Sequence, residues 1–224
     1  MNQKFLLTLT LGFISIFSAM AYEEPKYQVL SSQDEFEIRH YAPMLIAQVF
    51  IDGDMDEASS KGFRLIADYI FGNNQATDQT DRAKIAMTTP VTIEPMAKKI
   101  ETTTPVTVEA LGIESNLENS RAWRVNFVMP SQYNMNNIPK PNNKEVVLKE
   151  IPEKFFVVYR YSGFNTLSRV QSKSDITMNW IKSRGLTPIG SPQLSRYDPP
   201  WTLPMFRRNE IMVEIKKPSV NSVK

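Results

Sequence analysis

The sequence predicts an α+β fold built on antiparallel sheets. Stretches of alternating apolar and polar residues, typical of half-buried strands, follow one another in pairs. Two stretches have the apolar spacing of a helix, and two helices cannot cover both faces of a fully parallel sheet. The same order of strand, strand and helix also occurs twice, with an offset of about 110 residues. These observations favour a duplicated unit with antiparallel pairing.

The first copy of this unit begins with residues 36–41, where apolar and polar side chains alternate, and continues with the apolar run 44–51. A helix follows, because apolar residues recur at i, i+3, i+4 and i+7 on one face: Phe63, Ile66, Ala67 and Ile70. Gly72 is expected just past its end as a C-terminal cap. Asp54 or Asp56 is expected at its start as the N-terminal cap.

The second copy has strands at residues 146–151 and 155–161, followed by a helix that carries Leu167, Val170, Trp180 and Ile181. Further strands are predicted for residues 84–94, 103–109, 123–129 and 211–216. The stretch 131–144, rich in proline and asparagine, is the expected seam between pseudo-repeats at about 27–130 and 145–216. Neither half could bury its sheet face alone, so residues 22–224 are predicted to form a single domain.

The composition excludes several kinds of site. The 224 residues contain no cysteine and one histidine, which excludes disulfides, thiolate zinc sites and centres with several histidines. The chain has 26 basic and 24 acidic residues without a basic block, which gives no electrostatic case for nucleic acid. No nucleophile-elbow or phosphate-loop motif occurs, and no paired acid and base is visible. The sequence therefore predicts a protein that is not an enzyme.

The first 21 residues have the pattern of a signal peptide. Lys4 precedes the uncharged apolar run 5–17, and Ala19-Met20-Ala21 supplies a small-x-small cleavage site. A membrane anchor is the alternative, but the run is shorter than the ~20 residues that a spanning helix needs. We expect cleavage near Ala21 and an exported, periplasmic chain without a stable membrane span.

Three strings of residues resemble the SOUL family of haem-binding proteins. The longest is residues 197–211, YDPPWTLPMFRRNEI, and the others are residues 84–91, KIAMTTPV, and residues 37–41, EIRHY. The likeness extends over nearly the whole chain after residue 26. The resemblance implies a distorted antiparallel β-barrel of two pseudo-symmetric halves, each with one main helix.

The resemblance also implies a function. Members of the family bind haem or another tetrapyrrole non-covalently in an apolar cleft beside the first helix, so we expect a carrier, scavenger or buffer of haem. The alternative is a general binding module for flat amphipathic small molecules, without iron ligation. Either ligand would be held reversibly, because the chain has no cysteine for a covalent haem link.

Three residues are candidates for contact with such a ligand. His40 shares a strand face with Phe36 and Ile38, and a neutral imidazole facing a dry cleft is a competent axial ligand for haem iron. The resemblance supports this role, whereas a buried histidine bonded to the backbone is the alternative. Lys61 and Arg64 lie one turn apart on the first helix and could pair with haem propionates, or could simply be solvated.

The stretch Arg207 to Glu210 is expected to fix a hairpin through ion pairs and backbone hydrogen bonds, and contact with an anionic ligand is the alternative. Trp201, in the proline-rich loop before it, is expected to be a packing anchor.

Overall fold

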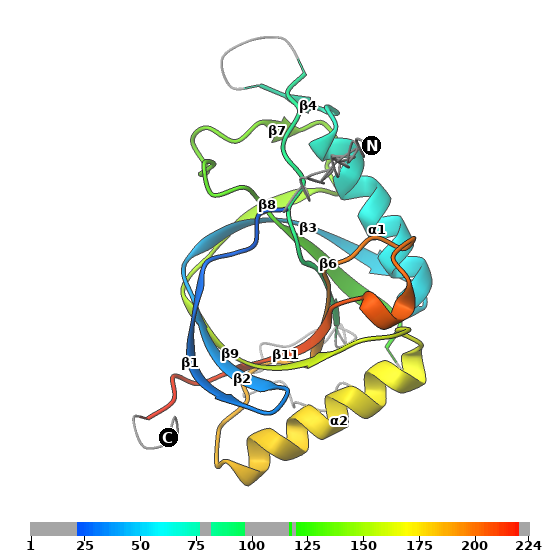
Figure 1. Cartoon of the computed structure of the whole chain (residues 1–224). Helices are drawn as coiled ribbons and strands as arrows, with labels where there is room; N and C mark the ends of the chain where they lie inside the picture. The colour runs from blue at the N-terminus through cyan, green and yellow to red at the C-terminus, as the bar shows by residue number, and fades with distance from the viewer. Residues whose placement is uncertain (1–21, 77–81, 97–116, 118–119, 220–224) are drawn as a thin grey trace, which may run out of the picture.

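Nine strands form one antiparallel sheet in the order β1-β2-β9-β11-β10-β5-β6-β3-β8 (Figure 1). The computed structural model describes residues 22–76, 82–96, 117 and 120–219. The strands are β1 (Tyr27–Gln33), β2 (Phe36–Tyr41), β3 (Met44–Asp52), β5 (Val91–Pro95), β6 (Ala122–Val128), β8 (Val147–Ile151), β9 (Lys154–Tyr161), β10 (Gln193–Arg196) and β11 (Asn209–Ile215). A separate two-stranded sheet pairs β4 (Asn74–Gln75) with β7 (Lys140–Pro141).

The large sheet curls into a distorted barrel, and its two helices lie outside the ring (Figure 1). Helix α1 (Met55–Ile70) packs on β3, β6 and β5, and helix α2 (Leu167–Ser183) packs on β9 and β11. The edge strands are β1 and β8, and no ladder joins them among the described residues. The predicted α+β class and distorted antiparallel barrel are therefore confirmed.

From β2 to β8, the strand order consists of two halves that mirror each other. The positions of β2, β9, β11 and β10 on one side correspond to those of β8, β3, β6 and β5 on the other. Chain order also repeats, since β2-β3-α1 and β8-β9-α2 follow the same sequence of elements. A duplicated unit would produce this arrangement, but the duplication itself stays a prediction.

Each strand presents alternate residues to the two faces of the barrel wall, because successive side chains of a strand point to opposite sides. On β6, Trp123, Val125 and Phe127 are fully buried and belong to the main core under the helices. The intervening Arg124 and Asn126 face the barrel interior, where they line a cavity. The helices thus cover an apolar outer face, while the inner face carries charged and polar groups beside a second, smaller apolar cluster of Tyr41, Phe156, Val158 and Met212.

Helix α1 is fixed at its ends and on its inner face. Asp54 is its N-cap, as predicted, and its carboxylate accepts a hydrogen bond from the Glu57 N–H at 2.8 Å. Gly72 follows the C-cap residue with φ of +121°, a conformation that favours glycine. At Gly62 the helix approaches β6 so closely that an added Cβ would lie 2.6 Å from Val125 Cγ2.

The predicted elements differ from the structure in several places. The strand expected at residues 84–94 begins only at Val91, because Pro90 has no N–H to donate and Thr88 instead bridges Glu23. Phe63 is 41% exposed: the core side of α1 centres on Gly62 and Ile66, which leaves its ring at the margin against Phe127. Strands β1, β4, β7 and β10 were not predicted.

Two predicted segments lie outside the described residues: the strand at 103–109 and the signal peptide at 1–21. Within the described part of the chain, neither α1 nor α2 is long and apolar enough to cross a membrane.

Candidate functional site

A buried charged network closes one region of the barrel interior. The Arg39 guanidinium on β2 donates to the Glu210 carboxylate on β11, and the Tyr197 hydroxyl donates to the same carboxylate at 2.6 Å. Arg208 donates to Glu210 from a third direction at 2.9 Å, and its guanidinium lies 3.7 Å from the centre of the Tyr197 ring. Glu210 has no exposed surface. We refer to Arg39, Tyr197, Arg208 and Glu210 as the charged lock.

The lock keeps Glu210 ionised. Burial alone would raise the pKa of this carboxyl group, but the hydrogen bonds and positive charges of Arg39 and Arg208 lower it below its ordinary value. Burial raises the pKa of the Tyr197 hydroxyl, and the neighbouring Glu210 charge raises it further. The lock thus holds two guanidinium cations and one carboxylate anion together, with Glu210 ionised and Tyr197 neutral.

The lock accounts for three polar residues of the stretch 197–210. Tyr197, Arg208 and Glu210 all belong to it. Arg207 donates to the carbonyls of Thr202 and Pro200 at 2.7 and 2.5 Å. The expectation that Arg207 to Glu210 fix a hairpin by ion pairs and backbone hydrogen bonds is confirmed. The polar groups of these residues are already bonded to other groups of the protein.

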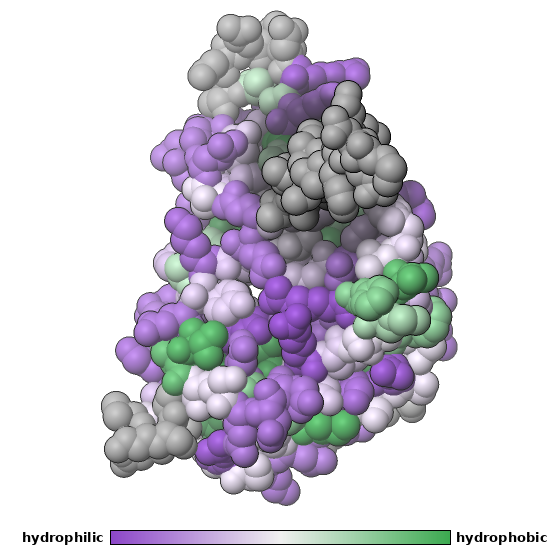
Figure 2. Space-filling model, in the orientation of Figure 1, coloured by the Kyte–Doolittle hydropathy of each residue, from purple (hydrophilic) through white to green (hydrophobic). Residues whose placement is uncertain are grey.

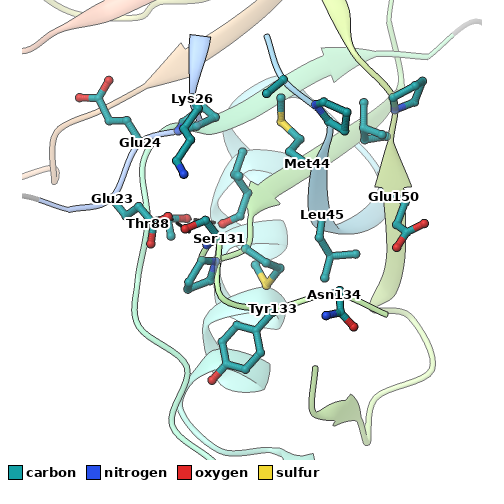
Figure 3. A pocket seen from close by; sticks show the side chains of 18 residues that line it. Glu23, Glu24, Lys26, Met44, Leu45, Thr88, Ser131, Tyr133, Asn134 and Glu150 are labelled. Atoms are coloured by element: carbon teal, nitrogen blue, oxygen red, sulfur yellow. Dashed lines mark hydrogen bonds between the residues drawn. The ribbon is translucent and has the colours of Figure 1, made fainter. Parts of the chain in front are cut away.

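A cavity of about 660 Å³ opens at one end of the barrel, where the start of β3 and the end of β8 lie beside residues 23–26 (Figure 3). We call it the end cavity. Its wall combines apolar side chains, such as Met44 and Leu45, with polar and charged ones, most of which Figure 3 labels. Glu23 is committed to the backbone N–H of Ser131 at 2.9 Å, a contact that lowers the pKa of its carboxyl group. The volume is within the range of small-molecule sites.

A second cavity, of about 330 Å³, lies inside the barrel, and we call it the lumen cavity. It shares four lining residues with the end cavity, namely Pro25, Met44, Val128 and Ile151. The two cavities are therefore neighbours, separated by the side chains of those residues.

Four charged side chains from four strands meet in the lumen cavity. Arg124 on β6 pairs with Glu94 on β5 at 2.9 Å, and Lys154 on β9 pairs with Glu214 on β11 at 2.5 Å. Burial raises the pKa of the Glu94 carboxyl group, while Arg124 and Lys154 act against the rise. Sequence reasoning missed this cluster. The sequence signal for this cluster was the presence of charged residues at inward-facing positions of otherwise mostly apolar strands.

The third candidate surface is an exposed group of apolar side chains on two adjacent loops. We call it the loop surface; it consists of Phe164, Trp201, Leu203, Met205 and Phe206, which are 58–81% exposed. Figure 2 shows hydrophobic side chains gathered over the segment that contains the short 3-10 helix η2 (Pro204–Phe206), orange-red in Figure 1. Trp201 is the most exposed of them, so the expectation of a packing anchor was wrong.

The loop surface adjoins α1 through the end of β10. Arg196, the last residue of β10, donates to Ser59 of α1 at 2.8 Å, and its guanidinium lies 3.8 Å from Asp56. Asp56, Ser59 and Phe63 follow one another along one side of the helix. The partly exposed ring of Phe63 therefore lies on the side of α1 that Arg196 approaches.

His40 lies on the outer face of β2, at the side of the barrel that β9 shares. Its ring stacks on Phe155 with centroids 4.4 Å apart, and its Nε2 lies 2.9 Å from the Glu153 carboxylate. The side chain is about one-third exposed, at 30%. His40 lines neither the end cavity nor the lumen cavity.

Lys61 and Arg64 are exposed on α1, and neither has an ion-pair partner among the described residues. Four strands separate β2 from the β3–β6 pair on which α1 packs. The structure thus places Lys61 and Arg64 on one helix and does not bring His40 to them. In the described part of the chain, no three His, Asp or Glu side chains are grouped as a metal site would require.

The architecture defines the class: an antiparallel α+β barrel with two outer helices and ligand-sized cavities at its end and interior. Within that class, the chain belongs to the SOUL heme-binding protein family, whose model matches residues 22–214. No curated protein is significantly similar to the chain.

Solved structures share the fold at low sequence identity. The C-terminal domain of EcmrR has a TM-score of 0.55 and 13% identity, over 86% of this chain and 99% of that chain. An uncharacterized conserved protein from Listeria innocua has a TM-score of 0.55 and 12% identity, over 81% and 92%. A hydrolase from Listeria innocua has a TM-score of 0.52 and 10% identity, over 83% and 94%. At these identities the likeness concerns the fold alone.

Proposed function

We propose that the chain binds haem or a related tetrapyrrole, reversibly and without a covalent link, at the loop surface and the adjoining side of α1. The observation that carries the proposal is membership of a heme-binding family over residues 22–214. The loop surface adds a physical reason. A soluble protein rarely leaves a contiguous group of large apolar side chains in water unless they meet a ligand or a partner.

The chemistry of this region suits a flat macrocycle with two carboxylates. Trp201 and Phe206 offer broad aromatic faces, on which a porphyrin ring can stack. On α1, Lys61 and Arg64 lie one turn apart on the exposed surface of the helix, and neither has an ion-pair partner among the described residues, so both charges are available to the propionates. Arg64 can hold a carboxylate with two parallel hydrogen bonds.

In this role the protein acts as a carrier, scavenger or buffer of the ligand and catalyses no reaction. Export to the periplasm is part of it, supported by the charged start, apolar run and small-residue site within residues 1–21. Reversible binding suits these roles, because each requires that the ligand be released.

A haemin titration of the mature chain, residues 22–224, tests the proposal. We expect a saturable, sharpened Soret band, and an affinity at least about tenfold lower in the double variant Trp201→Ala/Phe206→Ala, since each aromatic contact contributes about 1 kcal/mol. Phe71→Ala is the matched control, because Phe71 is another highly exposed aromatic residue, at 60%, but lies at the C-terminal end of α1. Equal affinities in the wild type and the double variant would exclude the loop surface.

One observation favours a second function, the binding of flat amphipathic molecules without iron ligation. The chain's one histidine lies on β2, and the loop surface belongs to other strands and loops. In this case metal-free protoporphyrin should bind as tightly as haem. A clear preference for the iron form would count against it.

A further inference from the structure

We propose that the lumen cavity is a second binding site, for an amphiphilic carboxylate whose head group also donates a hydrogen bond, as in an N-acyl amino acid. The site is independent of the loop surface and of tetrapyrrole binding. Its evidence is a set of buried polar atoms without partners, an unbalanced positive charge and an apolar passage to the end cavity.

Two buried polar atoms on β6 have no hydrogen-bond partner among the described residues: Arg124 Nε, a donor, and Asn126 Oδ1, an acceptor. Both side chains line the lumen cavity. A buried polar group without a partner costs free energy, so such atoms mark a place that a ligand or water can fill. One ligand satisfies both atoms if it carries an acceptor and a donor close together.

The charge of the cavity favours an anionic acceptor. Arg124 and Lys154 are balanced by Glu94 and Glu214, with which they pair. Lys149 on β8, whose side chain is exposed to solvent, also lines the cavity and has no ion-pair partner among the described residues. The lining therefore has one positive charge in excess, and a carboxylate would balance it.

Strand register places the polar and apolar parts of the cavity in order. Gln48 on β3 and Thr92 on β5 are the cross-strand partners of Asn126, so these three polar side chains form one row. Two residues further along β6, Val128 lies opposite Ile46 and faces both cavities. A head group at Arg124 and Asn126 would thus leave its acyl chain among Val128, Ile46 and Met44, directed toward the end cavity.

The acidic residues at the outer opening do not oppose this assignment. Glu23 accepts hydrogen bonds from Ser131, and Glu24 pairs with Arg208 at 2.9 Å. Glu150 is exposed to solvent. An entering carboxylate therefore meets two committed acids and one hydrated acid.

Calorimetric titration with N-decanoylglycine tests the proposal, with its uncharged methyl ester as the matched ligand. We expect saturable binding of the acid, at least about tenfold tighter than the ester, because a charge-assisted hydrogen bond to a buried donor is lost in the ester. In Arg124→Gln/Glu94→Gln, which removes one balanced pair, the acid should bind no better than the ester. Val128→Phe, which narrows the passage, should weaken both ligands.

The loop variant Trp201→Ala/Phe206→Ala is the control, and it should bind N-decanoylglycine like the wild type. The two lumen variants should in turn bind haemin like the wild type, so this proposal and the haem proposal can fail separately. Urea unfolding establishes whether each variant is folded. If Arg124→Gln/Glu94→Gln does not fold, the binding measured with Val128→Phe tests the proposal instead. No saturable binding, or equal binding by all three variants, overturns the proposal and leaves the lumen cavity to water.

Discussion

Arg39 on β2 and Glu210 on β11 form two hydrogen bonds on the inner face of the barrel wall, Nη1 to Oε2 at 2.9 Å and Nη2 to Oε1 at 3.0 Å, although 171 residues separate them in the chain. Both are almost completely buried. A bidentate pair of this kind is directional, so it fixes β2 and β11 relative to each other although β9 lies between them.

Glu210→Gln should destabilise the chain by up to about 3–5 kcal/mol at pH 7, because the buried Arg39 loses its bidentate anion and keeps only Glu37, while the partly exposed Arg208 keeps only Glu24. The pKa of Glu210 is lower in the folded chain than its ordinary value of 4.5, so its contribution is complete above about pH 4.5 and is lost as the pH falls further. Urea unfolding between pH 7 and pH 3 should show a smaller acid loss of stability in the variant. Parallel curves for both proteins would contradict this.

Gly62→Ala should destabilise the chain by about 1–3 kcal/mol, since the new methyl group would overlap Val125 and α1 would have to move away from β6. Helix propensity alone predicts the opposite sign, a gain of up to about 1 kcal/mol. Urea unfolding decides between the two. The double variant Gly62→Ala/Val125→Ala should relieve the overlap, and Ser60→Ala on the exposed side of α1 should be nearly neutral.

Lys61→Gln/Arg64→Gln should weaken haemin binding by about two- to tenfold, in line with exposed ion pairs of about 0.2–1 kcal/mol each. The difference from the wild type should shrink as salt is added, because salt screens exposed charges. Haem dimethyl ester, which has no free propionates, should bind both proteins equally. Lys144→Gln, at another exposed lysine, is the control. A loss of affinity that persists with the ester would point to a packing effect instead.

His40→Ala should leave the Soret band of the haem complex unmoved. The Nε2 of His40 is engaged by Glu153, and its strand lies away from the helix that carries Lys61 and Arg64. The absorbance spectrum measures this directly. A shifted band would instead place the iron at His40 and move the proposed haem site to the outer face of β2.

The strands and helices with strong periodicity could be predicted from the sequence, and the surroundings of particular side chains could not. Alternation placed β2 at residues 36–41 without error, since each of its two faces has a different environment. Strand β10 has four residues and was missed, because its identity depends on pairing with β5 and β11. Trp201 was expected to be a packing anchor, whereas its proline-rich loop holds it in solvent.

The candidate site was harder to predict than the fold. His40 was chosen from its strand face and the family resemblance, and Lys61 and Arg64 from their one-turn spacing. Where these residues lie relative to one another depends on which strands become neighbours after the sheet curls. The lumen cluster joins Glu94, Arg124, Lys154 and Glu214, which are distant in the chain, so only the complete barrel brings them together. The two-residue period of a strand gives the face on which a side chain lies but not its partner on another strand of the barrel.

The loop that displays Trp201 and Phe206 is tethered at both ends, by Tyr197 before it and by Arg208 and Glu210 after it. Arg207 braces it from within, and Pro204 accepts from Gly163 at 2.8 Å. The loop therefore loses most of its conformational entropy when the barrel folds. A ligand that binds to it has to immobilise few further protein groups. Substitutions that loosen the lock should therefore lower the affinity of the loop surface for its ligand, and the loss should appear in the entropy of binding.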